Sequence, residues 1–90
     1  MEYDCNADLI GMDAEALVFF EVRFRADGAL VDPISSVSAV KQQRLVRAAS
    51  FYLHRHGLWD RVSRIDVIGI TPGQSSKYRI QWIKNAIQAD

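Results

Sequence analysis

Alternating apolar and polar residues predict two pairs of strands. Residues 16–25, rich in Val and Phe, form the strongest predicted strand, and residues 6–12 form its hairpin partner across a short turn. Residues 64–70 carry β-branched side chains throughout, and residues 77–83 alternate again. The turn signal Thr71-Pro72-Gly73-Gln74 separates these two segments and favours a second hairpin.

A helix is predicted between the two pairs. After a loop over 26–36, apolar residues recur at helical spacing from Val40 to Leu53, following an N-cap at Ser36 or Ser38 and ending near Gly57. A short C-terminal helix is expected over 83–89. The order strand, strand, helix, strand, strand predicts a mixed α/β sheet in a single domain over residues 1–90.

The two faces of the strand at 16–25 differ in polarity. A period of two places Val18, Phe20, Val22 and Phe24 on one face, which we expect to be the core. The other face begins with apolar residues and changes to charged ones halfway along. It therefore presents Glu21 and Arg23 side by side, in a site or to solvent.

Composition narrows the class of protein. The chain is 49% hydrophobic and 24% charged, the balance of an ordinary globular domain. Its longest apolar run, Ala16 to Phe20, is far shorter than the roughly 20 residues of a membrane span. The single cysteine, Cys5, cannot form an internal disulfide, and the acidic N-terminus lacks a secretory pattern. We therefore expect a cytoplasmic protein that is stabilised by packing.

The net charge of zero conceals two oppositely charged halves. Residues 1–32 contain eight acidic and two basic residues, a net charge of −6. Residues 33–90 contain nine basic and three acidic residues, a net charge of +6. The zero total argues against a strongly basic nucleic-acid-binding protein, but the distribution leaves room for a local cationic surface.

Two carboxylates are candidate metal ligands. Asp8 lies in the first predicted strand and Glu21 in its hairpin partner, so pairing of the strands can bring them within a few ångströms. Two such oxygen ligands suit Mg²⁺, which keeps waters and substrate phosphate in its other positions. Arg23 is placed to contact a phosphate. From spacing alone, a solvated or cross-strand-paired face is the favoured explanation of Glu21 and Arg23.

Five short motifs in order resemble those of the YraN family across nearly the whole chain. They are Asp8-Leu9-Ile10, the run from Leu17 to Arg25, Lys41-Gln42-Gln43-Arg44-Leu45, Arg64-Ile65-Asp66-Val67-Ile68 and Ile83-Lys84-Asn85-Ala86-Ile87. That family in turn resembles the Holliday-junction resolvases and the restriction-endonuclease-like, PD-(D/E)XK superfamily. The resemblance implies a restriction-endonuclease-like mixed sheet and a metal-dependent nuclease that acts on DNA, which can be branched.

The resemblance also assigns roles to individual residues. It implies that Asp8 and Glu21 bind Mg²⁺ or Mn²⁺ together with the main-chain carbonyl of Val22, and that Arg23 occupies the position of the motif lysine. Lys41 and Gln42 match positions that face the substrate backbone. Arg44 and Arg47 extend Lys41 into a basic ridge that suits a phosphate track, although such a ridge is usually a solvated helix face.

Differences from the family pattern leave two other functions open. A guanidinium stays protonated in proteins and cannot act as a base, so Arg23 favours a catalytically inactive module that binds nucleic acid or protein. Cys5 and Asn6 replace the family's Gly-Glu pair, which removes one carboxylate. The resemblance implies an N-terminal helix and a first strand ahead of this segment, so we expect either a trimmed or degenerate family member or further residues upstream of Met1. The sheet edge left open by an absent first strand would favour a structural homodimer.

Overall fold

The computed structural model describes residues 7–25, 32–73 and 77–89 of the chain. Its elements are β1 (Leu9–Asp13), β2 (Ala16–Phe24), the 3-10 helix η1 (Pro33–Ser36), α1 (Ala39–Arg55), β3 (Ser63–Pro72) and β4 (Tyr78–Ile87). The predicted mixed α/β class and the order strand, strand, helix, strand, strand are confirmed. The predicted first strand is shorter than expected, since Ala7 and Asp8 precede β1, and Asn6 lies outside the described residues.

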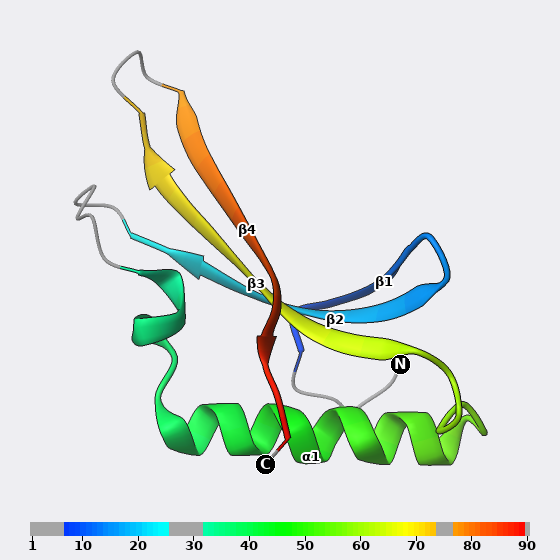
Figure 1. Ribbon diagram of the computed structural model, residues 1–90. Coiled ribbons are helices and arrows are strands. Elements are labelled where there is room, and N and C mark those ends of the chain that lie inside the picture. Colours follow the sequence, from blue (N-terminus) through cyan, green and yellow to red (C-terminus); the bar gives the residue numbers. More distant parts are fainter. Residues whose placement is uncertain (1–6, 26–31, 74–76, 90) are drawn as a thin grey trace.

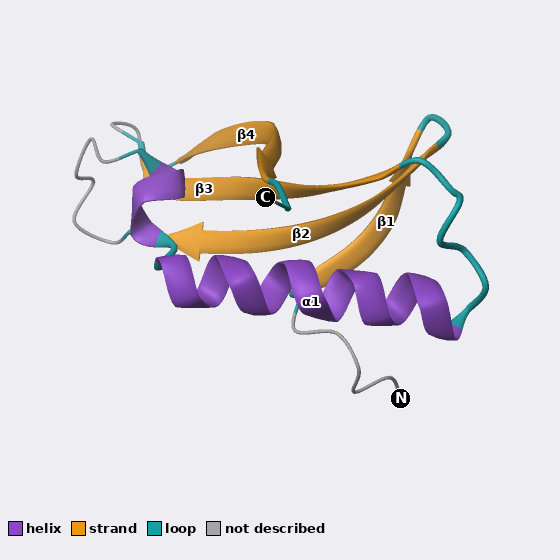
Figure 2. Cartoon of the chain, turned by 60° about the horizontal axis from the view of Figure 1, so that its bottom comes forward, coloured by secondary structure: helices purple, strands orange, loops and turns teal. Residues whose placement is uncertain are grey.

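The four strands form one twisted sheet in the order β1-β2-β3-β4 (Figure 1). β1 and β2 form an antiparallel hairpin, as do β3 and β4, whereas β2 and β3 run parallel. Parallel neighbours require a crossover connection, and α1 supplies it. Figure 2 shows α1 lying along one face of the sheet, which we call the helix side.

Local chemistry fixes both ends of α1. The Ser38 hydroxyl accepts a hydrogen bond from the Lys41 N–H at 3.1 Å, so Ser38 is the N-cap. Gly57 follows the helix with a φ of 67°, a left-handed conformation that favours glycine, and its N–H bonds to the His54 carbonyl. Within the described ranges, no helix is long and apolar enough to cross a membrane.

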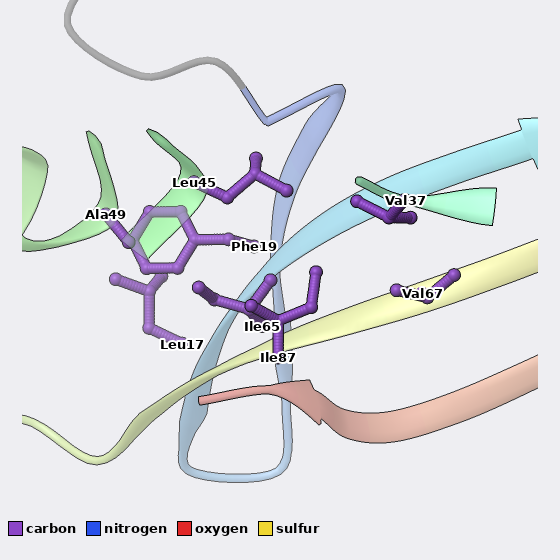
Figure 3. Packing of buried hydrophobic residues seen from close by; sticks show 8 residues of the cluster. All are labelled: Leu17, Phe19, Val37, Leu45, Ala49, Ile65, Val67 and Ile87. Carbon is purple, nitrogen blue, oxygen red and sulfur yellow. The ribbon is translucent and has the colours of Figure 1, made fainter. Parts of the chain in front are cut away.

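The core lies on the helix side of the sheet, which corrects the predicted face of β2. Leu17 and Phe19 are buried there, whereas Phe24 on the predicted core face is 54% exposed. Only Val18 of the four predicted core residues is classed as buried. The reason is that α1 covers the other face. The buried cluster consists of Leu17, Phe19, Val37, Leu45, Ala49, Ile65, Val67 and Ile87 (Figure 3).

The end of the chain is strand where a helix was predicted. β4 continues to Ile87, with Ile83 opposite Val67 and Ile87 opposite Ile65, so four steps along β4 match two along β3. Asn85 lies within this bulge at a φ of 54°. The apolar spacing that predicts a helix is therefore produced by a bulged strand that returns Ile87 to the core.

Candidate functional site

Asp8 lies where β1 stops pairing with β2. The pairing of β1 with β2 runs from Asp13 opposite Ala16 to Leu9 opposite Phe20, so Asp8 is the residue directly before the paired strand. The Asp8 N–H donates to the Phe20 carbonyl, and Asp8 Oδ2 accepts from the Val22 N–H, both at 2.9 Å. The carboxylate thus satisfies a strand donor that β1 does not reach, and this bond holds Asp8 at the residue that follows Glu21 in β2.

Glu21 is a buried carboxylate with one unsatisfied oxygen. The residue is 2% exposed, and α1 covers its side of the sheet. Its Oε2 lies 3.4 Å from Arg23 Nη1 and 3.7 Å from Lys41 Nζ. Its Oε1 is buried and has no hydrogen-bond partner in the described structure. A buried acceptor without a partner costs about 1–3 kcal/mol, so Oε1 is a ready position for a cation.

Arg23 is held in place by η1. Its Nε donates to Ser36 Oγ at 3.2 Å and its Nη2 to the Ser36 carbonyl at 3.1 Å. Asp32 caps η1 by accepting from the Ile34 N–H, and Pro33 packs over Gly69, where any Cβ would collide with the proline ring. Because η1 is seated on β3 in this way, the guanidinium next to Glu21 has a defined position.

The predicted nucleic-acid-binding residues separate into two groups. Lys41 contacts Glu21, and the Gln42 amide donates to the Val37 carbonyl at 2.9 Å, joining α1 to η1. Arg44 and Arg47 are exposed. A helix turns by about 100° per residue, so residues three apart rotate progressively away from the sheet. Of the predicted basic ridge, only Lys41 contacts the carboxylate site, and binding of nucleic acid by these residues stays a prediction.

Comparison with known proteins identifies the family. Residues 1–70 match the model of the "Uncharacterised protein family UPF0102". The chain belongs to UPF0102. UPF0102 is the YraN-like family that the five motifs predicted, so that prediction is confirmed. A UPF0102 protein of Marinobacter nauticus is 99% identical over 83 residues, which cover 92% of this chain and 68% of that protein.

More distant UPF0102 relatives match over a similar span. A protein of Coxiella burnetii is 43% identical over 84 residues, covering 92% of this chain and 67% of its own length. One from Chromohalobacter salexigens is 46% identical over 82 residues, covering 91% and 65%. The chain thus spans about two thirds of the length of these relatives.

The donor set of the UPF0102 chain fits Mg²⁺ better than a soft metal. The described residues contain no group of three or more His, Cys, Asp or Glu side chains that could hold a metal ion. A carboxylate pair suits Mg²⁺, which is bound by one or two carboxylates and retains several waters. Asp8 keeps free acceptor capacity after one hydrogen bond, and Glu21 offers the unsatisfied Oε1.

Sequence reasoning missed Ser36 as a site residue. It predicted Ser36 only as a candidate helix cap, whereas the structure uses its hydroxyl and carbonyl to hold Arg23. The signal was the segment from Asp32-Pro33 to Ser36, which is typical of a tight helical turn. The partner of such a turn lies 13 positions away, so the local pattern does not reveal it.

Proposed function

We propose that this UPF0102 chain is a metal-dependent, endonuclease-like domain that acts on DNA phosphodiesters. Asp8, Glu21 and the main-chain carbonyl of Val22 would hold Mg²⁺ or Mn²⁺. The observation that carries this proposal is Glu21 Oε1, buried and without a hydrogen-bond partner among the described residues, while Asp8 binds the N–H of the next residue, Val22. A buried ligand oxygen left open is what a cation-binding site requires.

The surrounding cations suit a phosphate substrate. A bound Mg²⁺ would neutralise charge on the phosphodiester and orient a water. Arg23, anchored by Ser36 and 37% exposed at its side chain, offers the free part of its guanidinium to a phosphate oxygen. Lys41 brings an amine to Glu21 from α1, and an amine can exchange a proton where the guanidinium of Arg23 cannot.

Titration with metal tests the site. We expect the chain to bind Mg²⁺ or Mn²⁺ at micromolar to millimolar strength in isothermal calorimetry, and Asp8→Ala or Glu21→Gln to abolish binding. Asp60→Asn removes an exposed carboxylate beyond α1 and serves as the matched control. Unchanged metal binding in Asp8→Ala and Glu21→Gln would refute the site.

An inactive module that binds nucleic acid or protein is the second candidate. The double anchoring of Arg23 to Ser36 favours it, because a fixed guanidinium binds phosphate but does not act as a base. Arg23→Lys distinguishes the two functions in assays on branched and linear DNA with Mg²⁺. Cleavage by the parent chain, or a gain of cleavage in Arg23→Lys, supports the nuclease; binding without cleavage in both supports the inactive module.

A further inference from the structure

A second cationic feature lies beyond η1, on the helix side of the sheet. Figure 1 shows the β3–β4 arm extending past η1 and away from α1. A cavity of about 280 Å³ lies here, between η1 and the ends of β2, β3 and β4. Its lining includes three arginines, Arg23, Arg25 and Arg79, together with Gln81 and Asp32.

Strand register explains why the arginines surround one space. Arg23 pairs with Gly69 on β3, and Gly69 pairs with Gln81 on β4. The Arg25 N–H bonds to the Ile70 carbonyl, and Arg79 lies opposite Thr71. Adjacent strands are about 4.8 Å apart, so the backbones of Arg25, directly after β2, and of Arg79 on β4 are about 10 Å apart with β3 between them.

Small side chains on the middle strand leave the space between these cations open. β3 contributes Gly69 and Thr71 at the two positions between β2 and β4. Pro33 covers Gly69 and closes the pocket on the side of η1. Two residues further along β3, between Arg25 and Arg79, Thr71 is too small to fill the space. The result is a pocket with cationic side chains on both flanks.

The charge of the pocket selects an anion. Among the described residues that line the pocket there are three guanidinium groups and one carboxylate, that of Asp32, which already accepts the Ile34 N–H as the cap of η1. Guanidinium groups on opposite flanks match the several acceptor oxygens of a phosphate. Arg23 belongs to both features, since its Nη1 contacts Glu21 while the residue lines the pocket.

We propose that the Arg23–Arg25–Arg79 pocket binds a phosphate group, namely that of the nucleic-acid strand next to the phosphodiester at Glu21. The assignment of the strand rests on the proposed function, whereas the phosphate chemistry rests on the pocket alone. The pocket would hold the strand in register while Arg23 links the two phosphate positions.

Salt-dependent DNA binding in EDTA tests the pocket without the metal. The variant is Arg79→Gln, because Arg79 is exposed on β4 and lies outside the Asp8–Glu21 site. The control is Arg61→Gln, the same charge change in the loop between α1 and β3, at the opposite end of α1 from η1. Binding of a labelled DNA duplex is followed by anisotropy across a range of salt concentrations.

We expect Arg79→Gln to weaken DNA binding several-fold at low salt. It should also reduce the slope of log affinity against log salt by about 0.9, the value for one lost phosphate contact. Arg61→Gln should leave the slope unchanged. The proposed phosphate pocket would be overturned by two results together. Arg79→Gln and Arg61→Gln would bind DNA with equal affinities and equal salt slopes, and inorganic phosphate would not compete with DNA for the parent chain.

Inorganic phosphate, compared with chloride at equal ionic strength, separates the two sources of phosphate. Competition by free phosphate that Arg79→Gln abolishes, without any change in the DNA slope, supports the pocket and overturns its assignment to a strand. Failure of the proposed function looks different: Mg²⁺ does not bind, yet the Arg79-dependent slope in EDTA persists.

Discussion

Two buried carboxylates on neighbouring strands have opposite environments. Glu21 on β2 is 2% exposed and Asp66 on β3 is 0% exposed. Asp66 Oδ1 accepts from Arg64 Nε at 3.0 Å and the Asn85 N–H at 2.8 Å, and its Oδ2 accepts from Trp82 Nε1 at 2.7 Å. Glu21, by contrast, has two cations at 3.4 and 3.7 Å on one oxygen, and no described residue donates a hydrogen bond to the other.

The difference separates a structural carboxylate from a candidate ligand. Register sets Phe20 opposite Asp66 and Glu21 opposite Val67, so successive residues direct the two carboxylates to opposite sides of the sheet. Donors from β3 and β4 satisfy both oxygens of Asp66, including the N–H of bulge residue Asn85. Asp66 therefore ties the bulge to the sheet, whereas Glu21 keeps capacity for a cation.

The largest expected effect is a loss of stability in Asp66→Asn. The amide cannot neutralise Arg64, and its NH₂ group would face donors in place of an acceptor. Removing one partner from a buried ion pair costs about 3–5 kcal/mol, and we expect about 3 kcal/mol here because Arg64 retains Asp13. Urea unfolding measures this, with Asp60→Asn as the exposed control; a loss below about 1 kcal/mol would contradict a structural role.

Sequence patterns revealed the strands but not the covered face of β2. The run from Ala16 to Phe19 is buried on both faces, so alternation there contains no polar residue that distinguishes core from surface. Glu21 and Arg23 lie on the same face of β2 as the buried Leu17 and Phe19, and their charges favoured the wrong prediction that this face is exposed to solvent. Their proposed role in a site came from the family resemblance, and contacts that are distant in sequence join Glu21 to Lys41 and Arg23 to Ser36.

The network of Asp66 was invisible to local patterns for the same reason. Asn85 bonds to a carboxylate 19 positions away, and Trp82 to the same carboxylate 16 positions away. The segment from Ile83 to Ile87 has helical spacing by itself, whereas its pairing with β3, the burial of Ile87 and the Asn85–Asp66 hydrogen bond favour the bulged strand. Propensity predicted β1, β2, α1, β3 and the first part of β4, because their partners are adjacent in sequence or strongly apolar, but it placed η1 within a predicted loop.

An intermediate effect is expected for Glu21→Gln. Its two ion pairs are long and involve side chains that are 37% and 38% exposed, so solvent screens them and their loss costs little. We expect the free energy of unfolding to change by about 1 kcal/mol or less. A loss as large as that of Asp66→Asn would make Glu21 a structural residue and remove the contrast.

Urea unfolding in the presence of Mg²⁺ gives a second test of Glu21→Gln. A ligand that binds only the folded chain raises its stability by RT ln(1 + [L]/Kd). Millimolar Mg²⁺ should therefore raise the urea midpoint of the parent chain and of Asp60→Asn, but not that of Glu21→Gln. An equal rise in all three proteins would place the metal elsewhere.

The smallest expected effect concerns the surface end of the Asp66 network. Arg64 Nη2 bonds to Asp13 Oδ2 at 2.6 Å, and Lys84 Nζ lies 3.2 Å from the same oxygen. Arg64 foremost, and then Lys84, lower the pKa of Asp13 below its usual value of 3.8, and Asp66 and then Asp13 raise the pKa of Arg64. Because the pKa of Asp13 is lower in the folded chain, its ionised form contributes stability above pH 4 and loses it as pH falls through the folded pKa.

Asp13→Asn should therefore flatten the acid side of the stability curve. The melting temperature of the parent chain should fall more steeply from pH 5 to pH 3 than that of Asp13→Asn, measured by circular dichroism at low salt. The difference should be small and should shrink in 0.5 M salt, because the Asp13 side chain is 33% exposed and screened. If the melting temperatures of the parent chain and Asp13→Asn fell equally from pH 5 to pH 3, the Asp13–Arg64 ion pair would add no stability. Arg64 would then stabilise the fold through the buried Asp66 alone.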